Sequence, residues 1–248
     1  VSNVINMNST FRYATSFNQP LTSWDVSNVD NMASMFSYAS NFDQNIGGWN
    51  VSNVNNMRHM FNTATNFNQS IGSWDVSAVT KMDVMFNGAS NFNQVLSGWD
   101  VSNVTTMQSM FSGATSFNQS LGNWDLSSIS VASGSPLGGS LFYMLNNCGM
   151  NKANYDATLI GWAENSQTPS NLTLGANSMN FCNYRNLTYS GHPFIPNNAS
   201  AEDYLESLNG VSGLGWTITG HNYNCNAALI GGTQSPNAKP IGMLDAHN

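Results

Sequence analysis

Carboxylates at one fixed interval are the first residues whose type and spacing could do chemistry. Asp25, Asp75, Asp100 and Asp125 share one position of a 25-residue spacing, and Asn50 holds that position in the remaining unit. Calcium prefers carboxylate and carbonyl oxygens, so this column is a candidate calcium site. The alternative is a solvated acidic stripe, or carboxylates that each cap nearby backbone N–H groups. Because Asn50 interrupts the column and no D-x-D-x-D-G loop is present, capping is favoured and no metal or cofactor is assigned.

Cysteine and histidine supply the other reactive side chains. Cys182 and Cys225 both lie beside expected strands, and a disulfide between them suits an extracellular protein. Cys148 stands where the repeat has an alanine and is expected to be a buried thiol. The four histidines have no fixed carboxylate partner, and the chain contains no G-x-S-x-G, H-E-x-x-H or P-loop motif. We therefore predict that the chain is not an enzyme.

The composition of the chain excludes several classes of protein. Only 8% of the 248 residues are charged, with six Lys and Arg against thirteen Asp and Glu. So few cations cannot neutralise a nucleic-acid backbone or anchor the chain to an anionic membrane. No apolar run approaches the roughly 20 residues that span a bilayer. No secretory signal is visible and the first residue is not Met, so the chain is interpreted as a processed product or an excised fragment.

An internal repeat organises the first half of the chain. Trp recurs with a period of 25 residues, and two Phe columns and two Met columns keep the same step. The Trp column consists of Trp24, Trp49, Trp74, Trp99 and Trp124. One unit reads approximately W-D-V-S-N-V-x-x-M-x-x-M-F-x-x-A-S-x-F-N-Q-x-L. The isolated unit is too small to offset the entropy of ordering it, so the units are expected to stack.

The spacing within one unit predicts its secondary structure. Apolar residues 29, 32, 35, 36 and 39 would form one stripe of a helix, and residues 21–26 alternate as in a short strand. The expected fold is therefore an α/β repeat, a solenoid of strand–helix coils. Recurrent Asn and Gln side chains in the return loop, such as Asn18 and Gln19, are predicted to hydrogen-bond along the stack.

The rhythm of the repeat fails beyond residue 126. Helices are expected over residues 155–162 and 201–208, and strands over 172–174 and 216–219, which together would form a C-terminal α+β cap. The predicted domains are a solenoid of five repeats and a degenerate last coil over residues 1–150, a cap over 151–230, and a polar tail or linker over 231–248.

The repeat motif resembles that of the BspA-type leucine-rich-repeat surface proteins of bacteria, also described as a mycoplasma-lipoprotein-type repeat. The resemblance covers residues 1 to about 130, and residues 153–162 and 215–219 look like the cap of that family. It implies a leucine-rich-repeat-like fold and a secreted or surface-anchored, non-catalytic protein with adhesive roles, some members binding host matrix proteins. No ligand-binding motif of the family transfers to residues of this chain.

Two functions follow as expectations. In the first, the chain is an extracellular repeat scaffold that binds a protein or a glycan at the cell surface. In the second, it is a structural subunit that assembles head to tail with copies of itself into a filament or sheath. The second draws on Val4, Met7 and Phe11, which would be exposed at the first coil unless another repeat or subunit covers them. Neither function involves nucleic acid or insertion of this chain into a membrane.

Overall fold

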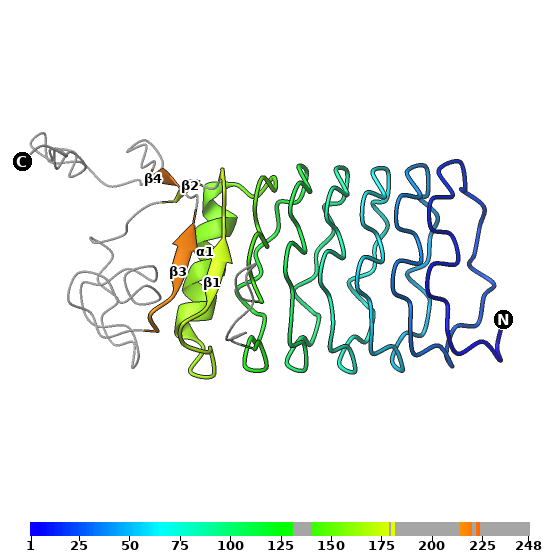
Figure 1. The fold of residues 1–248 in the computed structure, drawn as a ribbon, viewed down its shortest axis with the longest axis horizontal. Helices are drawn as coiled ribbons and strands as arrows, with labels where there is room; N and C mark the ends of the chain where they lie inside the picture. The colour runs from blue at the N-terminus through cyan, green and yellow to red at the C-terminus, as the bar shows by residue number, and fades with distance from the viewer. Residues whose placement is uncertain (131–139, 179, 182–213, 220–221, 224–248) are drawn as a thin grey trace, which may run out of the picture.

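The computed structural model describes residues 1–130, 140–178, 180–181, 214–219 and 222–223. The regular elements all follow the repeats (Figure 1). They are helix α1 (Lys152–Glu164) and strands β1 (Thr173–Gly175), β2 (Asn180–Phe181), β3 (Thr217–Thr219) and β4 (Asn222–Tyr223). Strand β1 pairs in parallel with β3, and β2 pairs in parallel with β4.

The predicted leucine-rich-repeat-like α/β solenoid of strand–helix coils is wrong. Residues 1–130 are described throughout and contain neither the helix nor the strand that this fold class requires. In the expected helix, Ser34 and Tyr38 have φ values of 57° and 61°, in the left-handed region that a right-handed helix cannot include. In the expected strand, the Trp24 N–H donates to the Leu21 carbonyl at 3.0 Å, which closes a turn.

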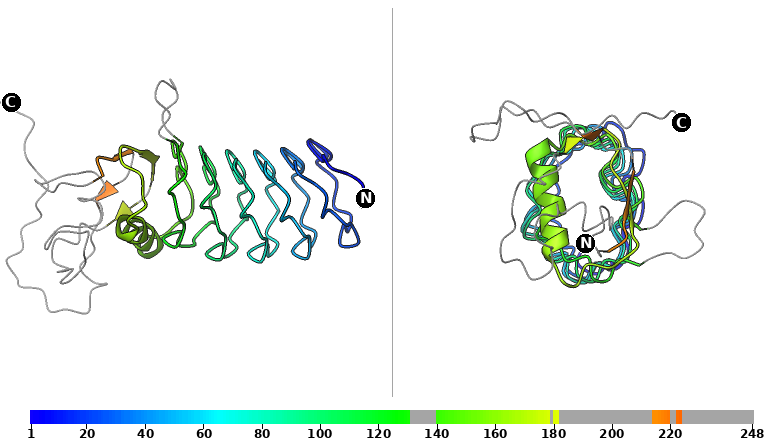
Figure 2. Two further views of the ribbon diagram at one scale, coloured as in Figure 1. Left: turned by 90° about the horizontal axis from the view of Figure 1, so that it is seen from below. Right: turned by 90° about the vertical axis from the view of Figure 1, so that its left-hand side faces the viewer.

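Each repeat is instead a coil of successive turns that bonds to the coils before and after it. Isolated parallel bridges join Asn6 to Asn31, Asn31 to Asn56, Asn56 to Lys81 and Lys81 to Thr106, each step being one repeat. Figure 1 shows these coils side by side from the N-terminus to α1. Seen along the row, the coils follow nearly the same outline (Figure 2). The apolar spacing of three therefore marks turns whose N–H groups bond across coils, and not a helix.

The core lies inside the coils. The predicted inward stripe is fully buried: Met32, Met35, Phe36 and Ala39 each have 0% exposure. Within each coil two Phe rings stack, as Phe61 does on Phe67 at 4.0 Å between ring centroids. Equivalent Phe rings of adjacent coils lie about 5.6 Å apart, as Phe36 and Phe61 do. The periodicity thus identified the buried residues correctly, although their backbone conformation differs from the predicted one.

Amide side chains connect the return loops, as predicted. The Asn68 Oδ1 accepts from the Asn93 backbone N–H at 2.9 Å and from the Gln94 Nε2 at 2.8 Å. Asp43 fills the same role for Asn68 and Gln69, because only the acceptor oxygen is needed. This amide ladder satisfies loop backbone that would otherwise lack partners.

Helix α1 continues the pattern of the coils. Its N-cap Asn151 accepts from the Asn154 N–H at 2.9 Å, which explains where the helix begins. Asn154 Nδ2 donates to Asn118 Oδ1 at 2.9 Å, the bond that a Gln makes elsewhere in the amide ladder. Trp162 Nε1 donates to the Leu121 carbonyl at 3.0 Å. Each repeat Trp from Trp49 to Trp124 likewise donates its indole N–H to the equivalent carbonyl of the preceding coil. The last coil is therefore covered by a helix that reproduces its contacts.

The element predictions for the C-terminal region are confirmed where the structure describes it. The helix expected over residues 155–162 is α1, and the strands expected over 172–174 and 216–219 correspond to β1 and β3. The helix expected over residues 201–208 and the tail over 231–248 lie outside the described residues. No helix within the described part of the chain has the length and apolar character needed to cross a membrane.

Candidate interaction face

The outward side of the bonded segments is where the repeat varies most in chemistry. We call it the ladder face; it comprises the exposed side chains of residues 6–13, 31–38, 56–63, 81–88 and 106–113. One column of this face runs Ser34, His59 and Val84. Because the bonds between these segments use backbone atoms, the outward side chains can change without breaking the stack.

Two exposed tyrosines stack at the N-terminal part of the ladder face. Tyr13 is 58% exposed and Tyr38 38%, and their ring centroids are 4.8 Å apart. The Arg12 guanidinium lies 4.8 Å from the Tyr13 ring centroid, within cation–π range. Large exposed aromatic side chains beside a cation are typical of binding surfaces. The next residues in this column, Thr63 and Gly88, are small.

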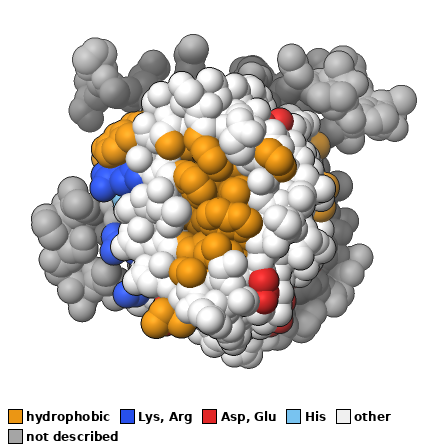
Figure 3. Space-filling model, turned by 90° about the vertical axis from the view of Figure 1, so that its right-hand side faces the viewer, with side chains coloured by type: hydrophobic (Ala, Val, Ile, Leu, Met, Phe, Trp, Pro, Cys, Tyr) orange, Lys and Arg blue, Asp and Glu red, His pale blue; other side chains and the backbone are white. Residues whose placement is uncertain are grey.

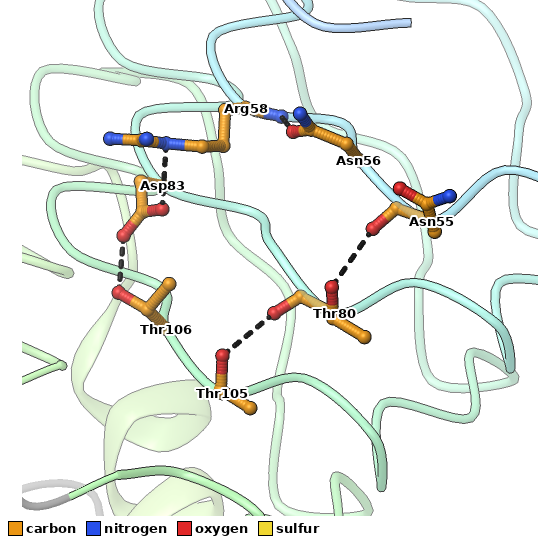
Figure 4. Close-up of polar contacts among 7 residues, drawn as sticks. All are labelled: Asn55, Asn56, Arg58, Thr80, Asp83, Thr105 and Thr106. Atoms are coloured by element: carbon orange, nitrogen blue, oxygen red, sulfur yellow. Dashed lines mark hydrogen bonds and ion pairs between the residues drawn. The ribbon is translucent and has the colours of Figure 1, made fainter. Parts of the chain in front are cut away.

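An ion pair joins two adjacent coils of the same face (Figure 4). Arg58 Nε lies 3.0 Å from Asp83 Oδ2, and the Thr106 hydroxyl donates to Asp83 Oδ1. The Asp83 side chain is nearly buried, whereas the Arg58 side chain is half exposed. The Arg58 backbone N–H donates to Asn56 Oδ1 at 3.2 Å, which holds the segment that carries the guanidinium. This pair therefore stabilises the stack and leaves part of the Arg58 cation at the surface.

His59 adjoins this ion pair. Partial burial, followed by the positive charge of Arg58, lowers the pKa of its imidazole below the usual value. The neutral form therefore predominates at neutral pH.

Threonines form a second line of contacts between coils beside the ion pair (Figure 4). Thr80 Oγ1 donates to the Asn55 carbonyl at 3.2 Å, and Thr105 Oγ1 donates to the Thr80 carbonyl at 3.0 Å. The backbone N–H of each threonine bonds to the same carbonyl as its hydroxyl. At this edge of the ladder face, each of these threonines therefore bonds to the preceding coil through both its backbone and its side chain.

The aspartate column makes local contacts. Asp25 Oδ1 accepts from the Ser27 N–H at 3.1 Å and from the Ser27 hydroxyl at 2.6 Å. Asn50 makes the same two bonds to Ser52. The serine two residues on lowers the pKa of the carboxyl groups of Asp25, Asp75 and Asp100. Asp125 accepts from the Ser127 N–H at 2.9 Å. Among the residues that the structure describes, no three His, Cys, Asp or Glu side chains lie together as a metal site would require.

The end of the first coil presents an apolar surface (Figure 3). Val4 and Phe11 are partly exposed there, as expected, but Met7 is only 3% exposed and does not belong to the exposed end. Phe17 and Trp24 are also partly buried and pack against the core, and the sequence reasoning did not include them. Their places in the Phe and Trp columns could have identified them, because the first member of each column lacks a preceding neighbour.

The remaining predicted site residues divide into two groups. Cys182 and Cys225 lie outside the described residues. Cys148 is buried, and this burial raises the pKa of its thiol to about 11.

The sequence analysis did not identify the two pairs of the ladder face, although Arg58 and Asp83, like Tyr13 and Tyr38, are one repeat apart. Opposite charges or aromatic residues in adjacent members of a column are the signal that would have found them.

Comparison with known proteins agrees with the repeat. The model of the family described as "Mycoplasma protein of unknown function, DUF285" matches residues 1–83 and 41–135, which together span 1–135 of the 248 residues. The chain belongs to this family. The matched segments are those that form the coils and the ladder face, and the family description assigns them no function. No curated protein and no solved structure matches the chain.

Proposed function

We propose that this chain is a non-catalytic extracellular scaffold, of the kind represented by the BspA-type surface proteins, which binds a protein or glycan partner through the ladder face. The observation that carries the proposal is the exposed pair Tyr13 and Tyr38 with the Arg12 guanidinium beside it. A stack in which each coil bonds to its neighbours holds these side chains in fixed relative positions. Fixed positions reduce the entropy lost when a partner binds.

The low charge of the chain supports a partner recognised by shape, amides and aromatic rings. Three cations, Arg12, Arg58 and Lys81, occupy the ladder segments, and Arg58 is engaged by Asp83. Long-range electrostatic steering is therefore weak, and contact with the tyrosine pair would dominate the affinity.

The test measures binding of the immobilised chain to fibronectin, to laminin and to an array of neutral glycans. The variant Tyr13→Ser/Tyr38→Ser removes both rings, and Val95→Ser is the matched control, because Val95 is 59% exposed and lies outside the ladder segments. We expect at least tenfold weaker binding for the tyrosine variant and unchanged binding for the control. Absence of binding to every probe, or equal binding by the tyrosine variant, would contradict the proposal.

A second candidate function is that of a subunit that assembles head to tail. The apolar end formed by Val4, Phe11, Phe17 and Trp24 favours it, because such a surface on a repeat stack is normally covered. Light scattering after size-exclusion chromatography tests this candidate over the micromolar range. Growth of the average mass with concentration would support assembly, and a stable monomer would rule it out.

A further inference from the structure

The ladder face collects the positive charge of an acidic chain. Of the four Lys and Arg side chains within the described residues, three lie in the ladder segments: Arg12, Arg58 and Lys81. Asp83 is the one carboxylate of these segments, whereas the other eight Asp and Glu residues of the described part lie elsewhere. Figure 3 shows Lys and Arg side chains along one flank of the coils and Asp and Glu side chains along the other. The ladder face is therefore positive, although the formal net charge of the chain is -7.

Two of the three cations are not neutralised by a carboxylate. Both ion pairs in the described part of the chain use other cations than Lys81 and Arg12. Lys81 is exposed and lies in an inner coil, where parallel bridges join it to Asn56 of the preceding coil and to Thr106 of the following one. Coils on both sides thus fix its position, and its exposure on the ladder face does not depend on either end of the stack.

The guanidinium groups act on one region of this face. Half of the Arg58 side chain is exposed, so it can engage a ligand while its Nε stays on Asp83. Burial and then the charge of Arg58 lower the pKa of the His59 imidazole, and the charge of Arg12 lowers it further, although Asp83 opposes both. The neutral imidazole between these cations can donate one hydrogen bond and accept another.

The negative charge of the rest of the chain does not prevent an anion from binding here. At physiological ionic strength, exposed charges more than about 8 Å apart are largely screened. A ligand on the ladder face therefore interacts chiefly with the cations of that face. Guanidinium groups bind carboxylates and other oxyanions through paired N–H groups, so the arrangement favours a ligand with such groups.

The backbone of the ladder face offers no edge to an extended peptide. In the third ladder segment every backbone N–H from Met57 to Thr63 already donates, either to the next coil, within its own turn or to Asn56 Oδ1. A peptide that binds by strand addition needs free backbone groups, so recognition here must use side chains. Partly exposed hydroxyl and amide side chains surround the cations; they include Ser34, Thr63, Gln108 and Ser109. Such groups can pair with the many hydroxyls of a sugar chain.

We propose that the ladder face binds an acidic glycan, a sugar chain that carries carboxylate or sulfate groups. Lys81, Arg58 and Arg12 face its anionic groups, and the hydroxyl and amide side chains of the ladder segments contact its hydroxyls. Tyr13 and Tyr38 contact its sugar rings. The assignment rests on the proposed function, which concerns the same face, and adds the charge and the chemical class of the partner.

The first test compares four probes on the immobilised full chain at physiological ionic strength. Dextran sulfate and dextran share a sugar backbone and differ in charge, polygalacturonate carries carboxylates instead of sulfates, and polyglutamate is an acidic peptide. We expect at least one acidic glycan to bind about tenfold or more tightly than dextran, and more tightly than polyglutamate. Comparing dextran sulfate with polygalacturonate identifies the acidic group. No binding of either acidic glycan, equal binding of dextran, or tighter binding of polyglutamate would overturn the proposal.

The second test removes the two cations that have no carboxylate partner. The variant Arg12→Gln/Lys81→Gln makes the net charge more negative by two units, and Asn50→Asp/Asn93→Asp is the matched control, which changes the net charge equally outside the ladder segments. Aspartates already occupy both control positions in other coils and make the same bonds there. We expect acidic-glycan binding to weaken about tenfold in the cation variant and to change little in the control. Equal weakening in both would show that the net charge, and not the ladder face, controls binding.

The variant Tyr13→Ser/Tyr38→Ser distinguishes this proposal from the proposed function. Binding that needs the tyrosines but is the same for dextran and the acidic glycans would keep the proposed function and reject the acidic partner. Acidic-glycan binding that needs the cations and is unchanged in the tyrosine variant would keep the acidic partner and reject the tyrosine pair as the contact that carries the proposed function.

Discussion

At the scale of single residues, the recurring polar side chains act through one acceptor oxygen each. Asn18, Asp43 and Asn68 occupy equivalent positions and accept the same pair of bonds from the next coil. Asp25 and Asn50 are interchangeable for the same reason. The amide and the carboxylate differ in charge. Exchanging one for the other should therefore change how the stability of the fold depends on pH, while the hydrogen bonds to the serine remain.

Replacing Asp75 by Asn tests this interpretation. The bond from Ser77 lowers the pKa of the Asp75 carboxyl group, so the unfolded chain binds the proton more tightly than the folded one. The carboxylate thus contributes stability above the unfolded pKa, near 3.8, and this contribution is lost as the pH falls through the lower folded pKa. We expect Asp75→Asn to leave Tm at pH 7 nearly unchanged and to reduce the loss of Tm on acidification. Thermal melts at neutral and acidic pH measure both, and an equal acid response would contradict the interpretation.

Replacing Arg58 by Met tests the ion pair. The nearly buried Asp83 carboxylate would lose its cation, and the free energy of unfolding should fall by about 1–2 kcal/mol. The loss is smaller than for a fully buried pair because half of the Arg58 side chain is exposed to solvent. Arg12→Met is the control, since Arg12 contacts the Tyr13 ring and no carboxylate in the described ion pairs. Urea unfolding at neutral pH gives both free energies of unfolding. An equal decrease in the free energy of unfolding for the two variants would show that the Arg58 cation does not stabilise the Asp83 carboxylate.

At the scale of elements, a coil derives its stability from its neighbours and α1 serves as the last of them. The Trp162 and Asn154 side chains of the helix repeat the bonds of a coil Trp and a coil Gln. At Gly161 the helix approaches Gly122 so closely that a Cβ at position 161 would collide with its backbone. A helix can thus replace a coil because it presents the same donors at the same places.

The dependence on neighbours predicts different costs for the same substitution at different coils. Phe61 stacks on Phe67 and lies between Phe36 and Phe86, so Phe61→Ala should lower the free energy of unfolding by about 3–5 kcal/mol. Phe11 is partly exposed and lacks a preceding ring, so Phe11→Ala should cost clearly less. Urea unfolding monitored by Trp fluorescence compares the two. Equal costs would mean that the end coil is as well packed as the inner ones.

At the scale of the whole molecule, the low charge follows from the stacking of equivalent residues. Each surface residue lies near its equivalent in the next coil, where identical charges repel and amides or hydroxyls bond. The aspartate column is the exception, and its charges are each held by a serine of the same coil.

Calcium provides a test of that column in the whole molecule. Because one oxygen of each aspartate already accepts from its own coil, we expect Tm to be the same in millimolar calcium and in excess chelator. Sodium chloride at equal ionic strength is the control for screening. A calcium-specific rise in Tm would establish the ion-binding alternative for Asp25, Asp75, Asp100 and Asp125.

Much of the buried surface could be predicted from the sequence, whereas the backbone that buries it could not. The stripe that includes Met32, Met35 and Phe36 is buried as its spacing indicated. A spacing of three apolar residues fits a helix, but it also fits turns whose N–H groups bond to another coil. The pattern within one unit therefore does not distinguish a helix from such turns. The left-handed φ at Ser34 and Tyr38 is the local feature that excludes the helix, and neither residue type indicates it.

The sequence by itself determined the repeat, its register, the residues of the core and the amide ladder. Each of these depends on which residue types recur one unit apart, and that information is local to the chain. The tertiary structure alone decided the turn-based coil, the ion pair of Arg58 and Asp83, and the direction of the backbone hydrogen bonds between coils. These depend on the direction in which each backbone N–H points, and that direction is set only when a second coil offers the acceptor.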